Sequence, residues 1–215
     1  MLTPAKSRLA IEKIIALYPN AVGSLTARSP FEIVVAVLLS AQATDVSVNK
    51  ATPALFERFP DPAALAAATA LEVEPYIKQI GLYHNKAKYL VALGQKLETD
   101  FNGVVPHTMT ELTQLPGVGR KSASVVLGDA FGIPAFAVDT HVSRIAKRLQ
   151  IAAEQASVRQ VETAITTALP KAEWIHGHHA MINFGRDICH AQKPACQTCP
   201  LLPMCAFGQS YVQTH

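Results

Sequence analysis

Apolar side chains recur every three or four positions along most of the chain, which is the spacing of amphipathic helices. This pattern predicts helices over residues 4–18, 85–97 and 158–169, with others between them. The short apolar segment 133–138 contains Pro134, so we interpret it as a connector rather than a strand. We expect about ten helices and no strand, and therefore an all-α protein.

Polar residues that cap helices mark several of the expected helix starts. Ser29 is followed by Pro30 and Glu32, and the helix that begins there is apolar nearly all round, so we expect it to be central and buried. Asp61 before Pro62 marks another start. Three further starts pair Ser or Thr with Glu or Gln three residues later: Thr69 with Glu72, Thr108 with Glu111, and Ser157 with Gln160.

Composition agrees with a helical fold and narrows the class of protein. Alanine, the strongest helix former, occurs 33 times, and hydrophobic residues make up 49% of the chain. The most apolar run, residues 33–39, is far shorter than the ~18 residues of a membrane span, and we find no signal peptide. We therefore expect a cytoplasmic protein without a membrane segment. The formal net charge of +3 neither proves nor excludes a polyanionic partner.

All four cysteines lie close together near the C-terminus, at Cys189, Cys196, Cys199 and Cys205. Cytoplasmic thiols stay reduced, so this cluster indicates a metal site rather than disulfides. One C-x2-C pair with two flanking cysteines can ligate a tetrahedral zinc ion or an iron–sulfur cluster. The wide spans on either side of the pair favour the larger cluster, with zinc as the alternative.

The segment Leu115-Pro116-Gly117-Val118-Gly119-Arg120-Lys121 lies between two expected helices and predicts a helix-hairpin-helix. Gly117 and Gly119 would let the turn approach a phosphate without a Cβ in the way, and the next helix would offer its N–H groups. Such a motif grips a nucleic-acid backbone rather than reading bases. The helix dipole and Arg120 disfavour the charged form of Lys121, and a neutral lysine is a nucleophile for Schiff-base chemistry. A phosphate-binding lysine is the alternative interpretation.

Asp139 precedes a strongly amphipathic helix, for which it is a natural N-cap. The polar face of that helix carries His141, Arg144, Lys147 and Arg148, which we expect to face outward as solvated surface or as a second backbone contact. Two other segments place polar residues next to helix ends without being diagnostic alone. They are Ser40 to Asp45, which includes Gln42, and Gly81 to Ala87, which includes Leu82.

Together these motifs resemble the endonuclease III family of bifunctional DNA glycosylases. The resemblance extends from Ser40 to Cys205 and is most specific at 115–121, at Val138-Asp139-Thr140-His141, and in the cysteine spacing. It implies a helix-hairpin-helix DNA glycosylase fold with two domains. Residues 23–133 would form a six-helix barrel that contains the hairpin, and residues 1–22 with 134–215 would form a helical [4Fe-4S] domain.

The resemblance also implies a function and a set of roles. The protein would be a bacterial-type, nucleoid-associated monomer that excises oxidised pyrimidines from damaged double-stranded DNA and cleaves the abasic site by β-elimination. Lys121 would be the Schiff-base nucleophile, Asp139 the catalytic carboxylate, and the four cysteines the cluster ligands. Gln42 and Leu82 would fill and wedge the base stack, and Ser40, Asp45 and His141 would line the lesion pocket. Backbone contacts to DNA are expected from Gly117, Gly119, Arg120, Arg144, Lys147 and Arg148.

Two alternatives and two departures from the family accompany this interpretation. An adenine-specific mismatch glycosylase would lack a lysine at position 121 and would carry a long extra C-terminal domain. A non-catalytic DNA-binding module with a zinc knuckle would not need Lys121 and Asp139 together. Ser122 stands where the family often has threonine, and residues 209–215 contain no Lys or Arg. An uncharged tail would contribute little to nonspecific DNA affinity.

Overall fold

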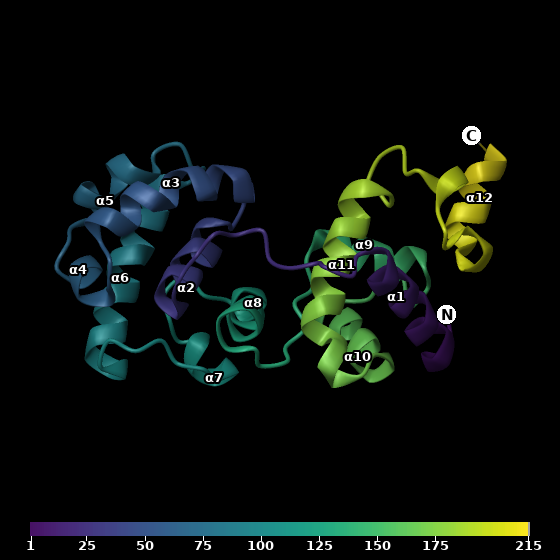
Figure 1. Ribbon diagram of the computed structural model, residues 1–215, viewed down its shortest axis with the longest axis horizontal. Coiled ribbons are helices and arrows are strands. Elements are labelled where there is room, and N and C mark those ends of the chain that lie inside the picture. Colours follow the sequence, from purple (N-terminus) through teal and green to yellow (C-terminus); the bar gives the residue numbers. More distant parts are fainter. Residues whose placement is uncertain (215) are drawn as a thin grey trace. The chain divides into compact units, whose positions relative to one another are not determined.

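The computed structural model describes residues 1–214, which form helices joined by turns and loops (Figure 1). No strand occurs within that range, so the all-α prediction is confirmed. The chain folds into two compact units. One unit is Ser24–Ile133, and the other joins Met1–Gly23 to the described residues from Pro134 onward. No helix within residues 1–214 combines the length and the apolarity that crossing a membrane requires.

The unit of residues 24–133 is built from consecutive helices, and α7 among them is a single turn of four residues. The helices are α2 (Pro30–Leu39), α3 (Asp45–Arg58), α4 (Pro62–Ala66), α5 (Ala70–Ile77), α6 (Tyr83–Phe101), α7 (Met109–Leu112) and α8 (Arg120–Phe131).

Helix α2 forms the core of this unit, as its all-round apolar pattern predicted. Phe31 and every residue from Val34 to Leu39 are buried, because α2 packs against α3, α6 and α8. Ser29 caps its N-terminus by accepting a hydrogen bond from the Glu32 N–H at 3.2 Å, and Pro30 opens its first turn. The Glu32 carboxylate accepts from the N–H of Arg28 rather than of Ser29, so this capping box is only half formed.

The other predicted helix starts agree with the structure, with one shift. Thr69 with Glu72 and Ser157 with Gln160 form complete capping boxes, and Thr108 accepts from the N–H of Glu111. The helix expected over 85–97 runs instead from Tyr83 to Phe101. Its N-cap is Leu82, which has no polar side chain, so no capping signal marked where the helix begins.

The second unit brings the start of the chain against its C-terminal half. Helix α1 packs against α10 and α11, and α9 packs against α10, α11 and α12. The buried residues of α1 include Ala10, Ile11 and Ile14, as its predicted apolar face required. The elements are α1 (Pro4–Leu17), α9 (Thr140–Arg148), α10 (Val158–Ala168), η1 (Lys171–Glu173), α11 (Trp174–Asp187), η2 (Cys196–Thr198), η3 (Leu202–Met204) and α12 (Ala206–Thr214).

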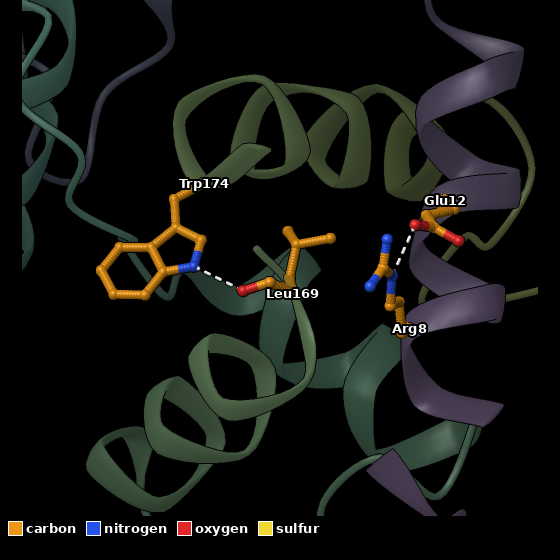
Figure 2. A network of polar contacts seen from close by, with 4 residues as sticks. All are labelled: Arg8, Glu12, Leu169 and Trp174. Atoms are coloured by element: carbon orange, nitrogen blue, oxygen red, sulfur yellow. Dashed lines mark hydrogen bonds and ion pairs between the residues drawn. The ribbon is translucent and has the colours of Figure 1, made fainter. Parts of the chain in front are cut away.

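Two polar contacts of this unit are shown in Figure 2. The Trp174 indole N–H at the start of α11 donates to the carbonyl of Leu169 at 2.9 Å and closes the turn that follows α10. On α1, Arg8 pairs with Glu12 one turn later at 2.7 Å. The pair is half exposed, so it adds only a few tenths of a kcal/mol, and the buried face of α1 holds the helix in place.

Candidate functional site

The turn between α7 and α8 has the tight form that its glycines predicted. The Val118 N–H donates to the Leu115 carbonyl at 3.1 Å, and both of these side chains are buried. Gly117 has φ +77°, and a Cβ there would lie 3.0 Å from Leu38 Cδ1 and 3.2 Å from Tyr89 Cγ. Position 117 therefore requires glycine both for its backbone angle and for the space around it.

The N-terminus of α8 is open and has no capping side chain. Gly119 is the N-cap and supplies no side-chain hydrogen bond, so the first N–H groups of the helix have no side-chain acceptor from the cap. A Cβ on Gly119 would meet nothing within 4 Å, so this side of the turn is open. Arg120 and Lys121 are the first two residues of the helix, and both are exposed. The arrangement joins a positive helix end to an accessible lysine amine.

Gln42 and Leu82 lie in two loops of the same unit. Both have left-handed backbones, with φ of 54° and 61°, and both are exposed. A Cβ on Gly81 would lie 3.7 Å from the Gln42 carbonyl oxygen, so the two loops are in contact. Nearby, the Ser40 hydroxyl donates to the Val37 carbonyl at 2.8 Å. The Asp45 carboxylate accepts a hydrogen bond from the hydroxyl of Ser24.

Asp139 occupies the N-cap position of α9, as predicted. Its Oδ1 accepts a hydrogen bond from the Val142 N–H at 2.8 Å, and its side chain is half-buried. The connector before it buries Phe136, Ala137 and Val138, which fixes where the helix begins. Asp139 and His141 belong to the second unit, whereas Lys121, Ser40 and Asp45 belong to the first.

The basic face of α9 differs from the expectation that it faces outward, because two of its arginines turn onto the cysteine loop. Arg144 Nε and Nη2 donate to the Cys189 carbonyl at 3.0 and 2.9 Å, and Nη2 also donates to the Gly185 carbonyl at 3.0 Å. The Nη2 atom also lies 3.1 Å from His141 Nδ1. A Cβ on Gly185 would lie 2.8 Å from His141 Nδ1, so the glycine lets α11 approach the His141 ring closely.

Arg148 is held still more extensively. Its Nη1 donates to the His190 carbonyl at 2.6 Å and to Cys189 Sγ at 3.3 Å, and its Nη2 donates to the Ala191 carbonyl at 3.0 Å. The guanidinium carbon also lies 4.2 Å from the centre of the Phe207 ring. Arg144 and Arg148 are therefore half-exposed side chains that bind the loop, which differs from the predicted freely solvated face. A helix pattern alone cannot show which segment will fold over its polar face.

The four cysteines are free thiols that line one shared cavity. The rest of the lining is mostly apolar, with Leu149, Phe184 and Leu201 among its residues. Burial raises the pKa of the Cys196, Cys199 and Cys205 thiols, and the charges of neighbouring cysteines raise it further. The four side chains share the lining of this cavity.

The donor set of this cavity fits a thiolate-bound group. Cys205 Sγ accepts a hydrogen bond from the Gly208 N–H at 3.3 Å, and Cys189 Sγ accepts the one from Arg148. Donors aimed at sulfur stabilise thiolates, and four soft sulfur ligands suit iron–sulfur clusters or zinc. Within residues 1–214, no three His, Cys, Asp or Glu side chains are arranged to hold a single metal ion.

Comparison with known proteins decides the family. Residues 35–171 match the family model of the HhH-GPD superfamily of base excision DNA repair proteins. Over 209 residues the chain is 46% identical to endonuclease III of Bacillus subtilis strain 168, covering 97% of this chain and 95% of that protein. The chain belongs to the endonuclease III family. It is 44% identical to endonuclease III of Escherichia coli K12, over 89% of this chain and 90% of the relative.

Solved structures agree with the family and the fold. A trapped covalent intermediate of an endonuclease III with DNA superimposes with a TM-score of 0.95 at 46% identity, over 99% of this chain and 100% of that one. A thermostable thymine-DNA glycosylase at 23% identity shares the fold, with a TM-score of 0.87 over 95% of this chain and 98% of the other. The predicted helix-hairpin-helix glycosylase fold is confirmed. The chain is thus a base excision repair enzyme of the DNA glycosylase/AP lyase class.

Among the buried polar residues of this endonuclease III family member is a lysine that no sequence motif marked. Lys86 on α6 is only 4% exposed, and its ammonium donates to the Leu39 carbonyl at 2.9 Å. A signal was present, because Lys86 shares the helical spacing of the buried Leu90, Leu93 and Leu97. A lysine on an apolar stripe indicates a buried polar contact.

Proposed function

We propose that this enzyme excises oxidised pyrimidines from duplex DNA through a Schiff base on Lys121 and then cleaves the strand at the abasic site. The observation that carries the proposal is the start of α8. There an exposed lysine follows an open, glycine-built turn directly at the positive end of a helix. The likeness to an endonuclease III trapped as a covalent DNA intermediate supports a covalent mechanism.

DNA binding begins with the phosphate backbone. The Gly117–Gly119 turn and the first N–H groups of α8 bind a phosphate, and Arg120 and Lys147 add positive charge. Flipping the damaged nucleotide costs a few kcal/mol, and less when the base is poorly stacked. Leu82 and Gln42 then occupy the vacated space and slow the return of the base. Ser40, Asp45 and His141 are proposed to contact the extruded lesion.

The chemistry proceeds at the sugar of the flipped nucleotide. The neutral amine of Lys121 attacks C1′, the bond from C1′ to the base nitrogen breaks, and the base leaves with the electron pair. Asp139 accepts a proton from the attacking amine and stabilises positive charge that develops on the sugar. The C1′–O4′ bond then breaks, O4′ takes up a proton as the sugar ring opens, and the imine formed between Lys121 and C1′ acidifies the C2′ protons. Loss of one of them breaks the C3′–O bond and cuts the strand on its 3′ side by β-elimination.

Cys189, Cys196, Cys199 and Cys205 are proposed to hold a [4Fe-4S] cluster. When bound, the cluster supplies strong iron–sulfur bonds whose formation energy contributes to folding of the loop. Arg144 and Arg148 hold the carbonyls of the same loop from α9, so helix and loop form one unit. We further propose that the enzyme works as a monomer on the DNA of a bacterial nucleoid.

Borohydride trapping tests the enzyme class and the nucleophile together. Reduction of the imine should fix the wild-type protein covalently to a duplex that contains thymine glycol, but not to the undamaged duplex. Lys121→Gln keeps similar length and polarity on an exposed residue, so it should fold and bind the lesion normally. Its base release and strand cutting should both fall by several orders of magnitude, and it should not trap. A Lys121→Gln protein that still releases the base would show that water performs the first step and would overturn the proposal.

A further inference from the structure

Lys86 is a buried cation at the point where two loops meet. Its ammonium is buried and donates a hydrogen bond to the carbonyl of Leu39, which lies 47 positions earlier in the chain. Burial lowers the pKa of Lys86, which is the direction that removal from water imposes on a cation. A lysine held at this cost needs an acceptor, and Leu39 provides it.

The acceptor lies at the C-terminal end of α2, where helix carbonyls have no partner within the helix. Three of the last four carbonyls accept from the residues that follow, through the backbone of Ser40 and Ala41 and the hydroxyl of Ser40. The last one, on Leu39, accepts from Lys86. A cation at this position also complements the negative end of the helix dipole. The end of α2 is thus completed by a side chain from α6.

The same lysine is tied to the Leu82 loop through its backbone. Its N–H donates to the Leu82 carbonyl at 3.1 Å. Gln42 follows Leu39 by three residues. Lys86 therefore binds a residue just before the Gln42 loop and also binds Leu82 in the other loop. Left-handed backbones at Gln42 and Leu82 cost about 1 kcal/mol each and persist only where surrounding contacts enforce them. Lys86 binds Leu82 directly and binds Leu39, which leads into the Gln42 loop.

We propose that Lys86 is a positioning residue that fixes the Gln42 and Leu82 loops relative to each other, so that both side chains enter the base stack together when a nucleotide flips. This inference rests on the proposed function of the same enzyme. If the Gln42 and Leu82 side chains were misplaced by about an ångström, they would fill the space left by the flipped nucleotide poorly, and the base could return. Lys86 acts through them and does not itself touch the DNA.

The decisive comparison uses two DNA substrates, of which only one requires a base to be flipped out of the stack. Lys86→Met keeps the length of the side chain and removes the ammonium. Its single-turnover rate of base release from a fully paired thymine-glycol duplex should fall about 10- to 100-fold. Its strand cutting at a preformed abasic site, where no base must be extruded, should fall less than about threefold. A lysine that only stabilised the fold would lower both rates together.

Matched variants keep the test sharp. Lys88→Met removes an exposed lysine from the same helix and should leave both rates unchanged. In a Leu82→Ala background, Lys86→Met should add little further loss, because residues that act through one another are not additive. Lys86→Arg retains a positive charge with a different shape. Its rate of base release should fall less than that of Lys86→Met, and its rate of strand cutting at an abasic site should stay near wild type. If Lys86→Met does not fold, Lys86→Arg is used in its place.

Two outcomes overturn the inference while leaving the enzyme's function intact. One is an equal loss on both substrates, and the other is full additivity with Leu82→Ala. A wild-type protein that neither releases thymine glycol nor traps would instead contradict the proposed function itself.

Discussion

Two glycines of the α8 turn meet opposite surroundings. A methyl group on Gly117 would press on Leu38 and Tyr89 at a backbone angle of +77°, whereas one on Gly119 would meet nothing within 4 Å. The φ of Gly119 is −86°, which any residue adopts. One glycine is thus required by the protein, and the other leaves open the space where a phosphate is proposed to bind.

Alanine at each position should therefore affect different properties. Gly117→Ala should lower the free energy of unfolding by about 1–3 kcal/mol because it adds strain and crowding. Gly119→Ala should leave the melting temperature unchanged or slightly higher, yet weaken DNA binding because its methyl group occupies the open space. Thermal melting and a DNA-binding titration measure the two effects. A Gly119→Ala protein that binds DNA as tightly as wild type would contradict phosphate binding at this turn.

Asp139 allows its capping role to be separated from its proposed chemical role. Asn is as good an N-cap as Asp, so Asp139→Asn should keep the bond to the Val142 N–H and the melting temperature. It loses the carboxylate charge, so base release should slow while the Lys121 amine remains trappable by borohydride. Asp139→Ala removes the cap as well and should cost about 1 kcal/mol of stability. Equal rates for Asp139→Asn and wild type would exclude the carboxylate from catalysis.

At the scale of elements, α9 and the cysteine loop are joined by Arg148. Arg148→Ala removes a donor from the carbonyls of His190 and Ala191 and from Cys189 Sγ. Leaving such groups unpartnered should cost about 1–3 kcal/mol, seen as a lower melting temperature. Arg148→Lys keeps the charge but cannot form the forked contact, so it should restore only part of the loss. An unchanged melting temperature for Arg148→Ala would show that the loop does not depend on α9.

The cysteine loop itself should depend on its proposed cluster. Cys199→Ser removes one ligand, so the protein should lose its broad absorption near about 400 nm and fold poorly, because ligation energy is folding energy. Gln197→Ser changes an exposed neighbour that contributes no thiol and should keep both colour and yield. A colourless Cys199→Ser protein with wild-type melting and cutting would refute a structural role for the cluster.

Elements were predictable where the signal was local. Capping residues gave the starts of α2, α5 and α10, and an all-round apolar pattern gave the buried position of α2, since both depend on a few adjacent residues. The start of α6 was missed because Leu82 caps it without a polar group. The orientation of Arg144 and Arg148 depends on a loop about 40 residues away, which helical spacing does not contain. The roles of Lys121 and Asp139 came from the family resemblance and remain predictions.

At the scale of the whole molecule, the net charge of +3 is too small to bind DNA by itself. A four-thiolate cubane would contribute about −2, so binding must depend on local groups. Lys147 lies on α9 beside Arg144 and Arg148, and its side chain is half-buried. The uncharged tail, which the structure describes as far as Thr214, contains no Lys or Arg.

Salt dependence should reveal these local contacts. Affinity should fall as salt rises, and Lys147→Ala should reduce the slope of log affinity against log salt by about one. The loss should be the same for damaged and undamaged duplexes, because a phosphate contact carries no information about the base. Lys13→Ala, on the exposed side of α1, is the control and should keep the wild-type slope. A loss confined to one lesion would mean that Lys147 contacts the base.

The pairing of α1 with α10 and α11 has a consequence for how the protein is made. The ribosome releases α1 first, but the helices that bury Ala10, Ile11 and Ile14 emerge more than a hundred residues later. The Tyr18 carbonyl likewise has its hydrogen-bond partner, the ring of His176, only after 158 further residues have been added. During synthesis the apolar face of α1 stays exposed while residues 24–133 already have all their own helices. Nascent chains stalled once residues 24–133 have left the ribosome, but before α10 and α11 have, should therefore bind chaperones through their first eighteen residues, and release them once α11 has emerged.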